Sequence, residues 1–541
     1  MSKNLVLTGL KESFFPRGNF CLGPWCNKEQ NKKLKYISAK LSLPSDLQKS
    51  QKCDFYYERL VEDVFSNFEK NFDLKWNKKS WEIFIGNWLH RYISVLYDRY
   101  CHLLFLKDKK FEKIKLLKYS KYSLITQDNQ NFIFNSNRDE WNLALYSIII
   151  DKLNIKNRFK IIYINLSSKN ITKIKKFNKK KPKKKFLFSN FVNPINKKII
   201  FNLYLKDNSS YLSFIKHFKI IPIKHNFYVS LNYPKKNSKI RKMEFTTNYK
   251  KIDNFEILLR ELFYEFVPKF YLEQINSLKK NYNIYFSKLN PREVYTSVGL
   301  QHDSDFKFWL ANLNSRKAVN LNILQHGCHY GSTKYSYAEK LETKLSNNFF
   351  TWGWKGKNKN IVPLFNFNNI KVNTKKSKNC KKILFVLASY YHYRLENHTG
   401  TIWGEKVKLY YDSLFNIVDL FNRNKKTSIF YRSPPNEKTL DNQTSKILKK
   451  QFNITKFDNN KIEFTKAIDK YDLVIFATET TAFLEALSAN KPCLLLAKKE
   501  LSEHRKDFIN KFEKLKKIKI VHTTEKSLIN HLKYIENNLN S

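Results

Sequence analysis

The stretch YDLVIFATETTAFLEALSANKPCLLL, residues 471–496, decides the fold class of this chain. It begins with an apolar run that is typical of a buried strand, and a polar turn with threonines follows. Phe483, Ala486 and Leu487 then recur at intervals of three and four residues, which predicts a helix with one apolar face. Pro492 prevents that helix from continuing, so the last apolar run is predicted to be a second buried strand. The order of strand, helix and strand indicates a parallel α/β sheet.

The same alternation extends outward from this stretch. One series of strands and helices begins with KKILFVLASYY and fills residues 381–541, and an earlier series runs from REVYTS to ILQHG. The sequence therefore predicts two Rossmann-like domains that face each other across a cleft, with ligands at the carboxyl ends of the strands. We place the N-terminal domain at 1–354, a linker at 355–380 and the C-terminal domain at 381–541. Aromatic and aliphatic residues at helical spacing predict a helical insertion at about 55–118.

The chain is strongly basic. Its 541 residues carry 100 Lys and Arg against 47 Asp and Glu, a formal net charge of +53. Such a charge suits nucleic acid, an anionic membrane face or a phosphate-bearing substrate. Lys, Asn, Ile, Phe and Tyr are all abundant while Gly and Pro are scarce, which is the effect of AT-rich coding, so nucleic acid is disfavoured as a partner. A block of lysines at about 169–199 is predicted to be a solvated insert, with contact to an anionic membrane as the alternative.

The cysteines and the apolar runs bear on the compartment. Seven cysteines are scattered without the spacing of a small disulfide scaffold, which favours reduced thiols and the cytoplasm. The N-terminus lacks the apolar stretch of a signal peptide, and no run reaches the roughly 18 apolar residues of a membrane span. We therefore expect a soluble cytoplasmic protein, or at most one held peripherally at the inner face of the membrane.

The turn before the helix of the opening stretch is the sharpest candidate for a binding site. Thr480 and Thr481 lie where free backbone N–H groups and the positive end of the helix dipole collect a phosphate. Glu485 comes one turn deeper on the same helix face, where its carboxylate can accept hydrogen bonds from ribose hydroxyl groups. The plainer alternative is a threonine helix cap with a surface glutamate.

This stretch resembles the donor-nucleotide segment of GT-B glycosyltransferases and of related polyol-phosphate transferases. The whole chain resembles more closely the LIC12162 family of transferases, found in bacterial regions for O-antigen and surface-polysaccharide biosynthesis. The resemblance runs from residue 5 to about 496 and rests on four blocks in order: TGLKESF with FCLGPWC, WEIFIGNWLHRYISVLYDRY, ILQHGCHYG with FFTWGW, and the Thr-Thr helix. It implies a GT-B-like fold that binds the acceptor on the N-terminal domain and the donor nucleotide on the C-terminal domain.

The resemblance also implies a function. We expect a glycosyltransferase that moves a sugar from a nucleotide-activated donor to a surface-polysaccharide or O-antigen precursor, with a glycan or lipid-linked glycan as acceptor. One alternative is a polyol-phosphate transferase that uses a CDP-activated donor. Another is a non-catalytic protein that binds glycan, membrane or nucleic acid.

The block ILQHGCHYG, residues 323–331, ends a predicted strand at the edge of the cleft. Gln325 and His326 would then lie where a phosphate leaves or an acceptor hydroxyl attacks, and Gly327 marks the turn. His326 is a candidate proton donor or base, because an imidazole titrates near neutral pH. The family pattern has a second glycine where this chain has Cys328, so backbone donation at this turn is less certain. A metal site and a plain turn with buried histidines are the alternatives.

The remaining candidates lie in loops after strands. Glu12 follows the first strand and is the first candidate for a base that deprotonates the acceptor hydroxyl. Arg394 and Arg432 follow strands of the C-terminal domain and are candidates for gripping the leaving phosphate, since a guanidinium binds phosphate through two N–H groups. A surface carboxylate or salt bridge is the alternative for each. The predicted donor-binding set is Gln325, Gly327, Ser389, Arg394, Arg432, Glu479, Thr480, Thr481 and Glu485.

The sequence favours chemistry without a metal. No pair of carboxylates follows a strand with the spacing of a metal-binding D-x-D motif. DSD at 303–305 has that spelling, but it opens a predicted helix, where aspartate serves as a cap. We therefore expect no metal site and no cofactor, with the nucleotide-activated donor as a substrate.

Overall fold

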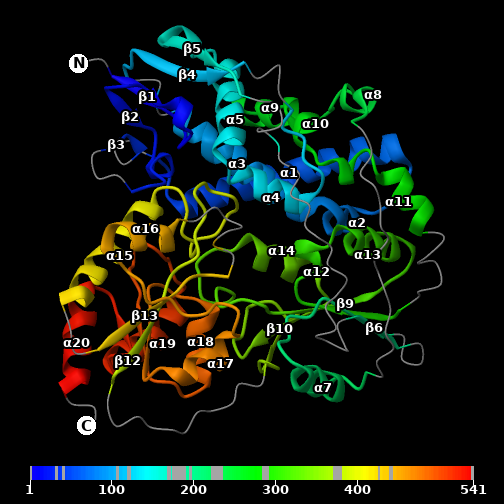
Figure 1. Cartoon of the computed structure of the whole chain (residues 1–541). Helices are drawn as coiled ribbons and strands as arrows, with labels where there is room; N and C mark the ends of the chain where they lie inside the picture. The colour runs from blue at the N-terminus through cyan, green and yellow to red at the C-terminus, as the bar shows by residue number, and fades with distance from the viewer. Residues whose placement is uncertain are drawn as a thin grey trace.

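The computed structural model describes residues 3–30, 34–38, 43–104, 106, 109–118, 123–166, 172, 190–193, 198–220, 236–282, 291–368, 380–423, 427–435, 437 and 443–537 (Figure 1). In these residues the strands form three sheets. The Lys-rich insert predicted at 169–199 lies mostly outside the described residues. Within them, no helix is both long enough and apolar enough to cross a membrane.

The N-terminal sheet has the strand order β3-β2-β1-β4-β5, and all of its neighbouring strands are parallel. Its strands are β1 Asn4–Val6, β2 Asn19–Cys21, β3 Lys35–Tyr36, β4 Lys113–Leu117 and β5 Lys160–Ile164. The residues KIKLL of β4 fall within the stretch 55–118 that the sequence predicted as helical, and that prediction is wrong for them. Charged and apolar residues alternate at the start of β4, which suits a strand with one buried face.

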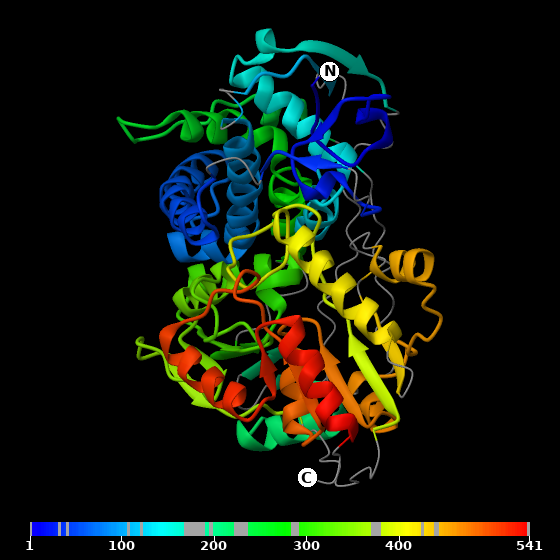
Figure 2. The ribbon, with the colours of Figure 1, turned by 90° about the vertical axis from the view of Figure 1, so that its left-hand side faces the viewer.

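A layer of helices packs beside the N-terminal sheet (Figure 2). Its longest members are α1 Asp46–Phe72 and α3 Asn87–Leu104. A capping box between Ser45 and Gln48 begins α1, and Trp81 and Trp88 are fully buried in the layer. Further α-helices among the described residues before 290 include α2 Lys78–Trp81, α4 Asn129–Ser136, α5 Asp139–Lys152, α8 Ser238–Arg241, α9 Asn254–Glu261, α10 Phe263–Phe266 and α11 Ile275–Asn281, and a π-helix spans Glu82–Gly86.

The middle sheet has the order β11-β10-β9-β8-β7-β6, and its pairs are parallel except β6 with β7. It contains β6 Asn190–Asn193, β7 Lys198–Phe201, β8 Glu293–Thr296, β9 Asn320–Leu324, β10 Asn348–Trp352 and β11 Ile361–Leu364, with helices α7 Asn208–His217, α12 Gly299–His302, α13 Ser304–Arg316 and α14 Tyr337–Leu345. The segment 355–380, predicted as a linker, therefore contributes the edge strand β11. Its apolar run IVPL pairs with β10, and Pro363 is tolerated because the strand lies at an edge.

The C-terminal sheet is wholly parallel, with the order β13-β12-β14-β15-β16. It contains β12 Lys382–Val386, β13 Ser428–Arg432, β14 Leu473–Phe476, β15 Cys493–Leu496 and β16 Val521–His522, with α15 Lys406–Arg423, α16 Thr444–Phe452, α17 Phe464–Ala467, α18 Thr481–Ser488, α19 Lys506–Lys517 and α20 Glu525–Asn537. Successive residues of β12 and β14 enter two separate apolar cores, one on each face of the sheet. Helices therefore cover both faces, as in a doubly wound sheet.

The predicted α/β class is confirmed, and the middle and C-terminal sheets form the two Rossmann-like units of the GT-B-like arrangement. The N-terminal sheet is an addition that the sequence did not predict. The strands before residue 165 pair only with each other, so the first 354 residues hold two sheets rather than one. One continuous apolar core joins the N-terminal sheet, the helical layer and one face of the middle sheet.

Candidate active site

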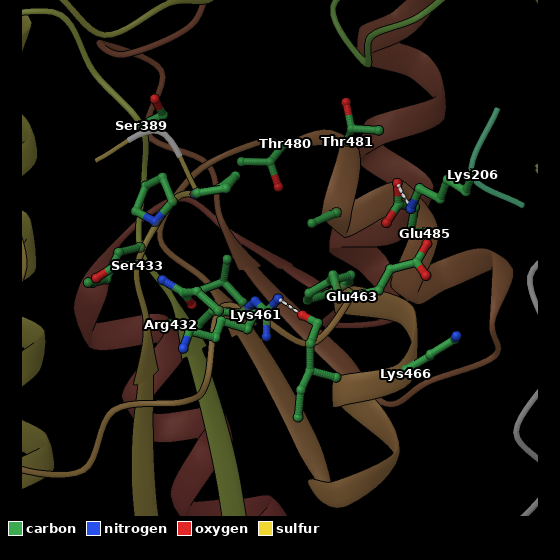
Figure 3. Close-up of a pocket in the computed structure, with 18 of the residues that line it drawn as sticks. Lys206, Ser389, Arg432, Ser433, Lys461, Glu463, Lys466, Thr480, Thr481 and Glu485 are labelled. Carbon is green, nitrogen blue, oxygen red and sulfur yellow. Dashed lines mark hydrogen bonds and ion pairs between the residues drawn. The ribbon is translucent and has the colours of Figure 1, made fainter. Parts of the chain in front are cut away.

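A cavity of about 930 Å³ lies at the carboxyl ends of β12, β13 and β14 (Figure 3). The segment that follows β7 of the middle sheet forms its opposite wall. The cavity is thus shared between the two sheets, at the place where α/β folds bind ligands. Its lining includes Tyr204, Lys206, Asp207, Asn208, Ser389, Arg432, Ser433, Lys461, Glu463, Phe464, Lys466, Thr480, Thr481 and Glu485.

The N-terminus of α18 forms one end of the cavity. Thr480 caps the helix by accepting a hydrogen bond from the backbone N–H of Phe483 at 3.4 Å, and Thr481 is the first helical residue. Phe483 and Ala486 are buried against the sheet, which fixes the direction of the helix. Asn490 ends the turn with a left-handed φ of 51°. The first backbone N–H groups of α18 and the positive end of its dipole therefore point toward the cavity wall, where they favour an anion.

Glu485 is buried one turn into α18 and faces the cavity. Its Oε1 lies 2.6 Å from Nζ of Lys206, which comes from the segment after β7 (Figure 3). Burial raises the pKa of Glu485 above its usual value, and the lysine partly opposes that shift. This ion pair joins the segment after β7 to α18 at the edge of the cavity.

The floor of the cavity carries several cations. Arg432, at the end of β13, donates to Asp458 and to the carbonyl oxygen of Ile462 at 2.6 Å, so its guanidinium is held in place. Lys461 and Lys466 line the cavity with exposed side chains. The charges of these residues suit a ligand that carries phosphate groups.

The cavity brings together Ser389, Arg432, Thr480, Thr481 and Glu485 from the predicted set. It also contains Lys206, Lys461 and Lys466, which the sequence analysis did not identify. Lysine is so frequent in this chain that one more lysine in a loop gave no signal. Only the position of the turn before α17, beside the carboxyl end of β13, could have suggested Lys461.

The structure places Arg394 away from the cavity, in a buried network between the C-terminal sheet and the helical layer. It pairs with Asp46 at the start of α1, and its guanidinium lies 4.9 Å from the ring centroid of Trp403. Lys406 approaches the same aspartate at 2.7 Å. Arg394 is only 3% exposed, so the predicted contact with a leaving phosphate does not occur in this arrangement. Its charge instead holds the loop after β12 against α1.

The side chain of Gln325 also makes hydrogen bonds that hold the fold together. Its side-chain oxygen accepts hydrogen bonds from the backbone N–H of Trp352 and the indole N–H of Trp354, each at 2.8 Å. Its side-chain nitrogen donates to the carbonyl oxygen of Gly327 at 2.8 Å. Both ends of the amide are thus used to hold the turn after β9 against the end of β10. Neither Gln325 nor Gly327 lines the cavity.

His326 is half-buried in the same turn, and its Nε2 lies 3.2 Å from the hydroxyl of Tyr330. Burial lowers the pKa of His326 to about 4, so the imidazole is neutral at neutral pH. A neutral imidazole is in the right form to accept a proton, but the burial that keeps it neutral also makes it a weaker base than an exposed histidine. The described residues contain no group of three His, Cys, Asp or Glu side chains that could hold a metal. In the DSD segment, Asp303 caps α13 by accepting a hydrogen bond from the backbone N–H of Phe306 at 2.9 Å.

Tyr330 connects this turn to a buried carboxyl group. It donates to Glu342 of α14 at 2.9 Å, and Gln301 donates to the same carboxyl at 2.8 Å. Glu342 is 1% exposed, and burial raises its pKa to about 8. The folded state therefore holds a proton on Glu342 that the unfolded state, with a pKa near 4.5, has already lost between those pH values.

We expect Glu342→Gln to change the pH dependence of stability. Because the folded state of the wild type binds more protons at Glu342, its stability falls as the pH rises from about 4.5 to about 8. Glutamine does not titrate, so the stability of the variant relative to wild type should increase between pH 6 and pH 9. Urea unfolding at both pH values measures this difference. The exposed control Glu513→Gln should show no such trend. If the stabilities of Glu342→Gln and wild type changed with pH in the same way, the expectation would be contradicted.

The last two predicted residues lie outside the cavity. Glu479 accepts a hydrogen bond from Nε2 of His504 at 2.8 Å, and this contact joins the turn before α18 to the segment before α19. Glu12 is exposed in the 3₁₀ turn Lys11–Ser13 beside the N-terminal sheet. No contact connects Glu12 with the cavity in the described residues.

Sheets of this order, with a charged cavity between the middle and C-terminal sheets, define an α/β protein of GT-B-like architecture. The chain belongs to the LIC12162 family of transferases: the model described as LIC12162 family transferase matches residues 3–541. It is therefore an enzyme of the transferase class.

Several solved structures are similar to parts of the chain. A structure of MnaA from S. aureus with UDP is 14% identical over 50% of this chain and 72% of that chain, with a TM-score of 0.31. UDP-GlcNAc 2-epimerase from Neisseria meningitidis bound to UDP-GlcNAc is 14% identical over 49% and 73%, with a TM-score of 0.31. HepE from Anabaena in complex with UDP and glucose is 10% identical over 53% and 80%, with a TM-score of 0.29. No curated protein matches the sequence.

Proposed function

We propose that this transferase moves a sugar from a nucleotide-activated donor to a precursor of a surface polysaccharide, and that the donor nucleotide binds in the 930 Å³ cavity. One observation supports this most. The N-terminus of α18, Arg432, Lys461 and Lys466 line the same cavity as the buried carboxylate of Glu485, which lies one turn into α18. Cations and free N–H groups suit a diphosphate, and the carboxylate of Glu485 suits ribose hydroxyl groups.

The chemistry follows from these charges. The bond between the anomeric carbon and the diphosphate breaks, and its electron pair stays with the leaving diphosphate. Arg432, Lys461 and the N–H groups at Thr481 stabilise the added negative charge, which is the largest contribution that fixed groups usually make to such a step. The acceptor hydroxyl attacks the anomeric carbon and gives its proton to a base.

His326 is the stronger candidate for that base. Its turn reaches the donor site, because the thiol of Cys328 hydrogen-bonds with the side chain of Thr481. The neutral imidazole can accept a proton, whereas Glu12 lies beside another sheet.

We further propose a glycan or lipid-linked glycan as the acceptor, bound on the side of the middle sheet. The reaction would occur in the cytoplasm, with peripheral contact to the anionic inner face of the membrane. The seven free cysteines are consistent with a reducing compartment, and the net charge of +53 suits an anionic surface.

A thermal-shift panel of CMP, CDP, UDP, GDP and dTDP tests the donor site. One nucleotide at about 100 times its dissociation constant should add roughly 2.7 kcal/mol of apparent stability. Since cationic side chains supply the charge, we expect the same shift with magnesium and with EDTA. A response to CMP together with CDP, and release of CMP from a CDP-activated donor, would favour the polyol-phosphate reaction instead. Cooperative melting without a response to any nucleotide would contradict the proposal.

A further inference from the structure

The wall of the cavity opposite α18 has a fixed main chain. The side chain of Asn368 accepts a hydrogen bond from the backbone N–H of Lys206 at 2.8 Å and donates to the carbonyl oxygen of Tyr204 at 3.2 Å. Asp207 caps α7 by accepting from the backbone N–H of Ser210 at 2.8 Å. Lys206 therefore presents its side chain to the cavity from a main chain that is held by Asn368 and by the Asp207 cap.

The Lys206 ammonium is held by Glu485. The carboxylate is 8% exposed and the lysine side chain 18% exposed, so both charges are largely removed from water. A buried carboxylate without a partner is costly, and the ammonium of Lys206 supplies the opposite charge. The pair is also the ion pair that joins the segment after β7 to α18 (Figure 3).

The ammonium lies close to the proposed phosphate position. Glu485 and Thr481 are four residues apart on α18, and side chains at this spacing are about 5–6 Å apart. The lysine stem is flexible, so rotation of its side chain about a fixed backbone can carry the ammonium from one position to the other.

Donor binding changes the partners of both residues. When ribose hydroxyl groups donate to Glu485, they supply hydrogen bonds that the ammonium supplied before. The released ammonium can then contact the negatively charged diphosphate. We propose that Lys206 is a phosphate ligand of the donor, delivered from the middle sheet, and that it exchanges Glu485 for the diphosphate when the nucleotide binds. This inference rests on the proposed donor site. It implies that residues from both the middle and the C-terminal sheets bind the leaving diphosphate.

Calorimetric titration tests the exchange with four nucleoside diphosphates, UDP, GDP, CDP and dTDP, and their matching nucleosides. We consider the nucleoside diphosphate that binds the wild type. Lys206→Met should weaken the binding of this diphosphate about ten-fold or more, which is the size of one charge-assisted hydrogen bond. The nucleoside should bind with unchanged or higher affinity, because it has no phosphate and no ammonium to displace. Lys206→Arg should restore most of the diphosphate affinity.

Two comparisons keep the test decisive. Lys198→Met removes a lysine of β7 that pairs with Glu293 at 3.6 Å and does not line the cavity, so it should change neither affinity. If Lys206→Met does not fold because Glu485 is left unpaired, the same titration compares Glu485→Gln with and without Lys206→Met.

The outcomes separate this inference from the donor site itself. If no nucleotide or nucleoside binds the wild type, the donor site is wrong and this inference fails with it. If nucleotides bind the wild type but Lys206→Met weakens nucleoside and diphosphate by the same factor, or weakens neither, the donor site stands and Lys206 is not a phosphate ligand.

Discussion

Replacing Asp98 with alanine is expected to lower the free energy of unfolding by about 3–5 kcal/mol. The side chain of Asp98 is 7% exposed and lies 2.9 Å from Nζ of Lys49, 3.4 Å from Arg99 and 3.6 Å from Nδ1 of His102. The variant would leave these groups buried without their shared counter-charge. Such a loss exceeds that of most surface substitutions because water cannot replace the missing carboxylate.

Urea unfolding at pH 7 measures this loss against an exposed ion pair. Asp412 contacts Lys408 on the surface of α15, and Asp412→Ala should cost at most about 1 kcal/mol. A loss for Asp98→Ala no greater than that of the control would contradict the expectation.

The effect should also depend on pH. Nearby Lys49 and His102 hold the pKa of Asp98 below its usual range, so the contribution is complete above about pH 4. It is lost as the pH falls through the lower pKa of the folded state, where the stabilities of wild type and variant should converge.

Replacing Glu485 with alanine is expected to reduce kcat/KM for the nucleotide-activated donor by about 100-fold or more. If the carboxylate binds two ribose hydroxyl groups, each charge-assisted hydrogen bond contributes about 1.5–3 kcal/mol, and both are lost. The variant also leaves Lys206 without its partner, so the two walls of the cavity lose the ion pair that joins them.

A matched carboxylate lies in the same cavity. Glu463 lines it with an exposed side chain and precedes α17, so Glu463→Ala removes the same charge from the same space. Steady-state kinetics should show a change below about three-fold for this control. Equal losses for the two variants would mean that the general charge of the cavity matters and that Glu485 has no specific contact with ribose.

The candidate site was partly predictable because one half of it is local in sequence. The cap at Thr480, the helix Thr481–Ser488 and the left-handed Asn490 follow from residues within ten positions of one another. Arg432 could be placed at the cavity for a similar reason, since a parallel sheet brings the carboxyl ends of its strands to one edge.

Other predicted residues lie outside the cavity, because their positions depend on distant partners. Arg394 follows a strand in the same way as Arg432, but it pairs with Asp46, which is 348 residues away in the chain. Gln325 similarly lies at a strand end, where Trp352 at the end of β10 and Trp354 just after it donate hydrogen bonds to its side chain. Nothing near either residue in the sequence indicates these contacts.

The sequence by itself determined the α/β class, the doubly wound C-terminal sheet and the threonine-capped turn before α18, because hydrophobic period, helix caps and proline act over a few residues. Only the tertiary structure decided that the first 354 residues form two sheets, that Arg394 is structural and that Lys206 faces Glu485. Strand partners and ion pairs form between segments that are remote in the chain. Their choice depends on how whole layers pack, and local patterns of residues do not encode it.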